Sequence, residues 1–462
     1  MNFLIPIFLT RLLAVSDYGA FKQIDLAAGL LAPILLLSLD RSLTYYLPRC
    51  GSDTISEVST VFWGALGVCA MVLGPLLLFP RLLEELFGLR PMALLGIAVA
   101  MNAVGGVVVL LAERALVAQG RGRIAGLTTL FLGLPYVGAL LVGAALTRSV
   151  AVCIAISAAE GLFILLVCGV VLWRTRVLRL TFRWAVLRRH LGFALPLWFI
   201  GIVQTWGSRM DRLLVTSRLS EVDYAVYSAG TTPLPFVGVI PTSIRDVSAP
   251  LFSRYEAESK PAQIAALWKR GSEVTLPIFL VAAAAQCTLA PFLVPLIFTE
   301  AFRPAVPIFM VSAATTFLGV FAGVENVLRA FAAFRFLAIF AVVSLTARVV
   351  AGWMVMPWRI LALQTVVQVA ITYAGTVFIL AYARRRLQVQ WRDLLPTRGW
   401  GLGLALSAGC AACSAGLEPL AKPLAAPLAA GIMALPWVAA AVLLALRVRR
   451  GRQSSSAGAT VA

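Results

Sequence analysis

Charged side chains interrupt long apolar stretches of this sequence. Within these stretches, they are the residues that could bind a ligand or take part in a reaction. Six are basic and lie within or at the edges of these stretches: Lys22, Arg41, Arg209, Arg212, Arg245 and Arg348. Acidic residues accompany them, namely Asp25, Asp40, Glu113, Glu160, Asp211, Asp246, Glu273 and Glu325. A charge at the centre of a membrane span costs about 2.5–3.5 kcal/mol, so such residues by default mark a polar path.

The arginines of this set suit the binding of an anionic head group. The planar guanidinium fork forms two hydrogen bonds at once with phosphate oxygens. We therefore predict a cationic cavity for a group such as a diphosphate, lined by Arg41, Arg209, Arg212, Arg245 and Arg348. The alternative, that each arginine forms an inter-helix salt bridge or extends to the membrane interface, stays open.

Five of the acids are predicted to couple ion movement to transport or to gate it. Three adjoin an arginine in the sequence, namely Asp40, Asp211 and Asp246. The other two, Glu113 and Glu325, occupy matching positions in an internal repeat and are candidate gate residues. They could equally be capping partners of Arg123, Arg335 or nearby loops.

The sequence lacks the usual residues of catalysis and metal binding. Its one histidine, His190, lies in a basic stretch, so zinc sites and catalytic triads are not indicated. Cys410 and Cys413 match a CxxC pattern, but they lie among small residues of the kind that pack membrane helices. We predict no catalytic residue, no metal site and no cofactor, with the coupling ion, H⁺ or Na⁺, left open, and we predict that the protein is not an enzyme.

The composition indicates a membrane protein. Hydrophobic residues make up 61% of the 462 residues and charged residues 13%, with a mean hydropathy of +0.93, whereas soluble proteins are about 45–50% apolar and about 25% charged. We predict an all-α polytopic membrane protein with about 14 transmembrane helices, since about 20 apolar residues span the hydrocarbon. The predicted spans are 1–13, 21–47, 57–80, 91–112, 124–147, 150–173, 192–216, 224–251, 272–298, 305–328, 336–357, 360–383, 399–417 and 424–446.

The placement of Arg and Lys predicts the orientation. Alternate loops carry most of these residues, and such loops lie in the cytoplasm, so both termini are predicted to be cytoplasmic. The net charge of +19 follows from this asymmetry, and nucleic acid is not an expected partner.

An internal repeat divides the chain into two lobes. Asp17–Phe21 (DYGAF) is echoed by Asp223–Tyr227 (DYAVY), an offset of 223 − 17 = 206. Glu113, Ala118 and Arg123 fit E-x-x-x-x-A-x-x-x-x-R, as do Glu325, Ala330 and Arg335, an offset of 325 − 113 = 212. Two similar lobes with a binding site near their interface are typical of transporters that alternate between open states.

The predicted domains follow from this repeat. They are an N-terminal lobe (1–173), a cytoplasmic basic linker (174–190), a C-terminal lobe (191–383), a basic loop (384–398), two extra helices (399–446) and a disordered cytoplasmic tail (447–462). The first predicted span is about half as long as its counterpart after Leu191 and cannot cross a bilayer of about 30 Å. We therefore expect the natural start to lie upstream of Met1.

Several stretches resemble a known family. RLLAVSDYGAF, SLDRSLTYYLPR, RMDRLLVTSRLSEVDYAVYSAG and SAPLFSRY are similar to oligosaccharide flippases of the Wzx type, polysaccharide biosynthesis proteins of the multidrug/oligosaccharidyl-lipid/polysaccharide export superfamily. The resemblance covers most of residues 1–385. It implies two six-helix lobes plus two extra helices. It also implies flipping of undecaprenyl-diphosphate-linked oligosaccharide across the bacterial cytoplasmic (inner) membrane to make O-antigen, capsule or exopolysaccharide. The expected partners are this lipid-linked oligosaccharide, membrane lipids, and the polysaccharide polymerase with its chain-length machinery.

Three other functions remain open. A cation-coupled multidrug or small-molecule antiporter of the same superfamily would need an acidic cavity, whereas the intramembrane charge leans basic. A membrane glycosyltransferase or O-antigen polymerase usually has long outer loops, which are not seen here. A peptidoglycan-precursor flippase is the third alternative.

Overall fold

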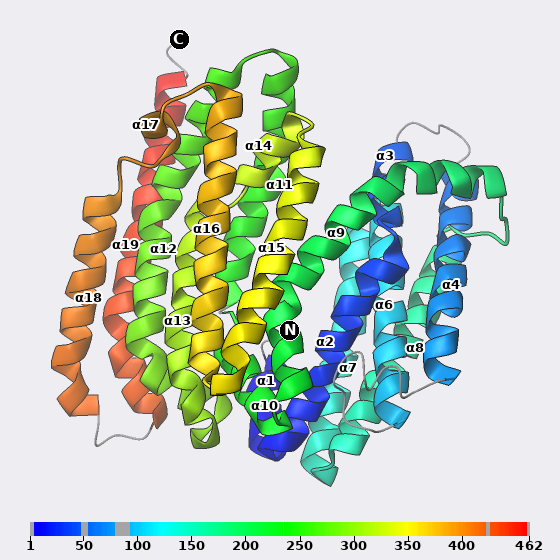
Figure 1. Cartoon of the computed structure of the whole chain (residues 1–462), viewed down its shortest axis with the longest axis horizontal. Helices are drawn as coiled ribbons and strands as arrows, with labels where there is room; N and C mark the ends of the chain where they lie inside the picture. The colour runs from blue at the N-terminus through cyan, green and yellow to red at the C-terminus, as the bar shows by residue number, and fades with distance from the viewer. Residues whose placement is uncertain (1–3, 48–53, 79–92, 234, 422–425, 460–462) are drawn as a thin grey trace. The chain divides into compact units, whose positions relative to one another are not determined.

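The structure is a computed structural model that describes residues 4–47, 54–78, 93–233, 235–421 and 426–459. Nearly all of these residues are helical, and no strand occurs among them. Figure 1 shows the helices as mostly long and packed side by side. The predicted all-α class is confirmed.

The helices that the structure describes in the first half are mostly long, and three of them have ten residues or fewer. They are α1 (Leu4–Leu12), α2 (Val15–Leu36), α3 (Leu39–Tyr46), α4 (Thr54–Leu78), α6 (Ala93–Ala118), α7 (Gly122–Thr147), α8 (Val150–Arg174), α9 (Trp184–Arg218) and α10 (Glu221–Gly230).

The second half alternates long α-helices with short 3₁₀ segments. They are α11 (Pro235–Ala257), α12 (Pro261–Phe298), η3 (Glu300–Ala305), α13 (Val306–Phe317), η4 (Leu318–Phe321), α14 (Val324–Ala330), α15 (Phe334–Val355), η5 (Met356–Trp358), α16 (Leu361–Leu387), α17 (Trp391–Leu394), α18 (Trp400–Ala421) and α19 (Ala426–Ala459). The segment 447–462, expected to be disordered, is therefore helical up to Ala459.

Twelve helical segments within the described residues are long and apolar enough to cross a membrane. The protein is therefore a multi-pass membrane protein. The predicted spans 1–13 and 224–251 are not among the twelve. Helix α1 has only nine residues, and the second span is divided into two helices, α10 and α11. The count of about 14 stays a prediction.

Two predicted continuous spans are divided by backbone breaks. In the span 21–47, Leu37 and Ser38 adopt left-handed conformations (φ 48° and 54°), which end α2 and start α3 at Leu39. Neither residue is a glycine, so the sequence carries no local signal for this turn. In the span 224–251, Pro233 and Pro235 lie at the break, where proline cannot donate the backbone hydrogen bonds of a continuing helix.

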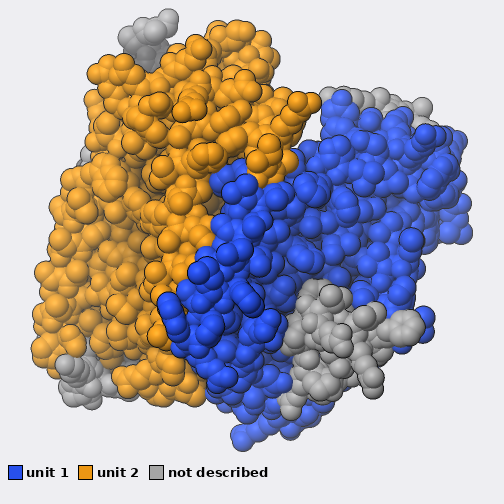
Figure 2. Space-filling view, viewed as in Figure 1, with its two compact units in different colours: residues 1–228, 340–359 blue, residues 229–339, 360–462 orange. Residues whose placement is uncertain are grey.

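The chain forms two compact units, which Figure 2 shows in different colours. Unit 1 comprises Met1–Ser228 and Phe340–Arg359, and unit 2 comprises Ala229–Ile339 and Ile360–Ala462. Helix α9 thus belongs to unit 1, although the predicted C-terminal lobe begins at Leu191. The lobes are defined by the sequence repeat, whereas the units are defined by packing. The predicted domain boundaries therefore stay a prediction.

Close helix contacts build each unit. In unit 1, α8 packs so tightly on α6 that a Cβ added at Gly161 would overlap the backbone of Met101. In unit 2, α12 packs on α18 and α19. These last two helices are joined by a hydrogen bond of 3.0 Å from the Trp437 indole on α19 to Ser414 Oγ on α18. Small residues permit such close backbone approach in membrane helices.

The Asp-Tyr repeat marks two equivalent helix starts. Asp17 is the third residue of α2, and Asp223 is the third residue of α10. The carboxylate of Asp223 accepts hydrogen bonds from Ser220 N (3.2 Å) and Ser220 Oγ (2.7 Å), and Ser220 Oγ accepts one from Asp223 N (3.1 Å). This is a capping box. The next residue, Tyr18 or Tyr224, is buried in both copies.

Candidate functional site

A lysine–carboxylate pair on α2 forms one side of the candidate site. Lys22 and Asp25 are three residues apart and therefore share a helix face, with Lys22 Nζ 2.6 Å from Asp25 Oδ2. The Lys22 side chain is 16% exposed, whereas that of Asp25 is 59% exposed. The hydroxyl of Tyr224 on α10 donates a hydrogen bond of 3.2 Å to the Lys22 carbonyl. The pair is thus anchored at Lys22 and open at Asp25.

Arg209 reaches this pair from α9. Its Nη1 atom donates a hydrogen bond of 3.0 Å to the backbone carbonyl of Asp25. One turn further along α2, a Cβ added at Gly29 would overlap the Arg209 guanidinium. Glycine at position 29 therefore makes the room in which this guanidinium lies against α2.

Three further charged residues of unit 1 lie on or beside α9. Asp211 accepts a hydrogen bond of 2.8 Å from the Tyr227 hydroxyl. Arg348, on α15, interacts electrostatically with Asp211 and Tyr227. Arg212 interacts electrostatically with Arg209.

We call these six residues the charge cluster: Lys22, Asp25, Arg209, Asp211, Arg212 and Arg348. Its four cations outnumber its two carboxylates, so the cluster carries a net positive charge on helices long and apolar enough to span a membrane. Such a site can attract an anion, and the three guanidinium groups can donate to its oxygens in pairs.

Polar groups of α6, α7 and α8 interact with one another, and two of them also interact with the cluster. Glu160 is hydrogen-bonded to Tyr136 and interacts electrostatically with Asp25. Asn102 Nδ2 donates to Ser157 Oγ at 3.0 Å. Asp25 therefore interacts electrostatically with Glu160 on α8 and with Tyr136 on α7.

The other predicted site residues of unit 1 lie on different helices. Asp40 falls in the first turn of α3, where a carboxylate interacts favourably with the helix dipole, and Arg41 beside it is exposed. Glu113 is half-buried near the end of α6. The structure brings together Arg209, Asp211, Arg212 and Arg348 from the predicted set, and their roles stay predictions.

Three predicted residues belong to unit 2. The exposed Arg245, on α11, donates a hydrogen bond of 3.1 Å to Thr242 Oγ1, and its carbonyl accepts one of 2.8 Å from Asn326. The side chain of Asp246 lies outside those that the structure describes. Glu325 pairs with Arg329 one turn along α14 at 3.2 Å. It is the second residue of this short helix, whereas its repeat counterpart Glu113 lies late in a long one.

A second polar group, at the ends of α3, α4 and α9, is missing from the predicted site. His190 is fully buried and bonds to Ser42 Oγ (2.8 Å) through Nδ1 and to Glu57 Oε2 (2.7 Å) through Nε2. Arg189 donates to the other oxygen of Glu57 at 2.5 Å. His190 ends the predicted linker 174–190, but α9 begins at Trp184 and carries this residue into the packing. Its partners are 133 and 148 residues away in the sequence, so no local pattern reveals them.

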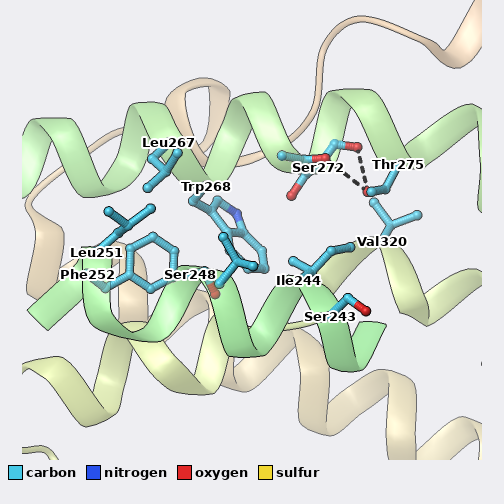
Figure 3. Close-up of a pocket in the computed structure, with 13 residues that line it drawn as sticks. Ser243, Ile244, Ser248, Leu251, Phe252, Leu267, Trp268, Ser272, Thr275 and Val320 are labelled. Carbon is cyan, nitrogen blue, oxygen red and sulfur yellow. Dashed lines mark hydrogen bonds between the residues drawn. The ribbon is translucent and has the colours of Figure 1, made fainter. Parts of the chain in front are cut away.

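A cavity of about 340 Å³ lies within unit 2, between α11 and α12. Figure 3 shows Leu251, Phe252 and Trp268 at one end and Thr275 at the other. The hydroxyl of Thr275 donates to the carbonyls of Gly271 (3.1 Å) and Ser272 (3.2 Å) in its own helix. The wall is otherwise mostly apolar, so this cavity does not suit a charged head group.

A sequence model of a family described as "Polysaccharide biosynthesis protein" matches residues 8–307, which confirms the resemblance seen in the motifs. No curated protein matches the chain.

Solved transporter structures share the fold. "Lipid II flippase MurJ, inward closed conformation" is 10% identical, with a TM-score of 0.68 over 97% of this chain and 99% of that one. An inward-facing multidrug resistance MATE family transporter of the MOP superfamily is 14% identical, with a TM-score of 0.66 over 84% of this chain and 94% of that one. A MOP superfamily transporter from Pyrococcus furiosus is 12% identical, with a TM-score of 0.58 over 84% and 91%. At these identities the likeness shows the fold, that of MOP superfamily transporters, and leaves the substrate open.

Proposed function

The chain belongs to the polysaccharide biosynthesis protein family, and from this premise we propose that it flips a lipid-linked oligosaccharide across a membrane. The proposed substrate is undecaprenyl-diphosphate-linked oligosaccharide, moved from the cytoplasmic to the periplasmic leaflet of the bacterial cytoplasmic membrane. Both chain termini lie in the cytoplasm in this proposal. The protein exposes the substrate site to each leaflet in turn, as transporters with two lobes do.

The charge cluster is the single observation that carries this proposal. A diphosphate bears negative charges on closely spaced oxygens, and guanidinium groups bind such oxygens in pairs. Arg209 is held against α2 beside Asp25, and Arg212 and Arg348 add two more guanidinium groups to the same region. A cationic drug would meet repulsion at this cluster, which disfavours the multidrug antiporter alternative.

The acids near these arginines supply a means of coupling. Asp25 and Asp211 lie in the charge cluster, so a cation bound at either carboxylate would be attracted by the negative charge of a diphosphate bound there. Binding of H⁺ or Na⁺ at these carboxylates would therefore be linked to binding of the diphosphate. Asp40, Asp246, Glu113 and Glu325 remain proposed coupling or gate residues on other helices.

The experiment is a flipping assay on the purified full chain in liposomes, with a labelled undecaprenyl-diphosphate oligosaccharide as substrate. Arg209→Ala and Arg212→Ala should each slow flipping at least tenfold, because each removes a charge-assisted phosphate contact of about 1.5–3 kcal/mol. Arg218→Ala is the matched control, since Arg218 is exposed at the end of the same helix. Full activity of both cluster variants at normal expression contradicts the proposal.

A peptidoglycan-precursor flippase is the second candidate function. The MurJ structure aligns with 97% of this chain, including most of its C-terminal region, whereas the MATE structure aligns with 84%. In cells, loss of the proposed flippase should leave completed oligosaccharide repeat units on the cytoplasmic leaflet. Accumulation of peptidoglycan precursor instead would support the second candidate.

A further inference from the structure

A slot in unit 1 lies between α7 and α8, two antiparallel helices joined by a short turn. It is a groove of about 650 Å³ that is open to the surface and is lined by Leu127, Phe131, Phe163, Leu166 and Val170, among others. The rings of Phe131 and Phe163 lie 6.0 Å apart. Leu127, Phe131, Leu166 and Val170 are each more than half exposed. Both helices are long and apolar enough to span a membrane, so a hydrocarbon chain is the matching occupant for this wall.

One end of the slot is basic. Arg174 and Thr175 line it, and Arg121 Nη1 donates a hydrogen bond of 2.7 Å to the Thr175 carbonyl. Arg123 and Arg176 are exposed next to these residues in the sequence.

No acid compensates this charge locally along the chain. Between Arg114 and Leu180 the sequence contains a single acidic residue, Glu160. Glu160 lies 174 − 160 = 14 residues from Arg174 on α8, which is about 21 Å at the rise of an α-helix. Along this stretch, basic residues therefore outnumber the single acid.

We propose that this slot is a binding site for an anionic phospholipid. One acyl chain lies between α7 and α8, and the phosphate of the head group contacts Arg121 and Arg174. An apolar slot that is lined at one end by Arg174, with Arg121 bonded to the neighbouring Thr175 carbonyl, matches both parts of such a lipid, whereas a zwitterionic lipid gains less from the excess positive charge. Since the distribution of arginines predicts that this end is cytoplasmic, the lipid belongs to the inner leaflet. The inference does not depend on the transported substrate.

Native mass spectrometry of the purified full chain tests this site, with phosphatidylglycerol and phosphatidylcholine of equal chain length as probes. The wild type should retain phosphatidylglycerol preferentially. Arg121→Gln and Arg174→Gln should each lower its apparent affinity about fivefold, the effect of one basic residue near an anionic lipid. Arg148→Gln is the matched control, because Arg148 lies in the turn at the opposite end of the same two helices.

A second pair of variants tests the acyl-chain slot. Val167 lines the slot, and Val167→Trp should reduce retention of phosphatidylglycerol by filling it. Leu130→Trp should not, because Leu130 is exposed on α7 outside the slot lining. Equal retention of the two lipids, unchanged affinity in Arg174→Gln, or an equal loss in Arg148→Gln overturns the proposal. Displacement of phosphatidylglycerol by an equal concentration of undecaprenyl diphosphate also overturns it, because the slot then selects a polyprenyl lipid.

Discussion

Replacing Gly29 by alanine tests whether the position of Arg209 matters for binding of the proposed substrate. The added methyl group would overlap the Arg209 guanidinium. That guanidinium is the far end of a flexible side chain, so it can move aside while both helices stay in place. The expected change is the loss of the hydrogen bond from Arg209 Nη1 to the Asp25 carbonyl, now 3.0 Å long.

Two opposing terms set the effect on stability. A hydrogen bond from a charged donor contributes about 1.5–3 kcal/mol, and this one is solvent-exposed, which places it at the lower end. Alanine is favoured over glycine inside a helix by about 1 kcal/mol. The free energy of unfolding should therefore change by less than about 1 kcal/mol.

Substrate binding should change much more than stability. If Arg209 contacts the diphosphate, losing that contact costs about 1.5–3 kcal/mol, which corresponds to a roughly 10- to 150-fold weaker affinity. The assay is binding of undecaprenyl-diphosphate oligosaccharide to the purified chain, with thermal unfolding measured in parallel. Gly126→Ala is the control, because a Cβ at Gly126 has no heavy atom within 4 Å.

A double-mutant cycle isolates the mechanism. Gly29→Ala should have little further effect on affinity in an Arg209→Ala background, since the group that it displaces is already absent. If Gly29→Ala weakens binding equally in both backgrounds, the glycine acts independently of Arg209 and the reasoning is refuted.

Four further predictions concern stability, each measured as the change in unfolding midpoint of the purified chain. Gly161→Ala should destabilise the protein by about 1–3 kcal/mol, because its Cβ would overlap the rigid backbone of Met101. Gly271→Ala should instead stabilise it by about 0.5–1 kcal/mol, since a Cβ at that helical position meets no atom within 4 Å; equal effects of the two variants would contradict this packing. Glu57→Gln should cost about 1–3 kcal/mol, as it removes the buried carboxylate that bonds to Arg189 and His190, and no measurable effect would show that these contacts are not needed. Ser220→Ala should cost about 1 kcal/mol through loss of a capping box, and no change would mean that Asp223 alone caps the helix.

The fold class could be predicted from composition and the length of apolar runs. The Asp-Tyr repeat was also informative, since Asp17 and Asp223 both stand third in their helices and the tyrosines that follow are both buried. Such features depend on residues close together in the sequence, so a local pattern reveals them.

Features made by distant segments could not be predicted in this way. The turn at Leu37 and Ser38 contains no glycine or proline that would indicate a turn in the sequence. His190 lies at the end of the predicted basic linker, and its partner Glu57 is 133 residues away, so no local pattern shows that the two are in contact.

The charge cluster is an intermediate case. Lys22 and Asp25 were recognised as charges within a span, but only the folded chain shows that Arg209 reaches the Asp25 carbonyl. A sequence identifies which residues are costly to place in a membrane, whereas their grouping depends on how the helices pack.

The attachment of the C-terminal helices to α12 has a consequence for the order of synthesis. Glu273 of α12 accepts hydrogen bonds from Thr397 N (3.3 Å), Thr397 Oγ1 (3.0 Å) and Arg398 N (3.3 Å), and Lys269 donates to the Arg392 carbonyl at 2.6 Å. These partners are made 123 to 125 residues later, which takes a ribosome roughly 6–25 s. During that interval α12 carries a carboxylate whose permanent partners do not yet exist. A chain released before residue 392 would never acquire these partners. Quality-control proteases should therefore distinguish the truncated protein from the complete one by the missing contacts of α12.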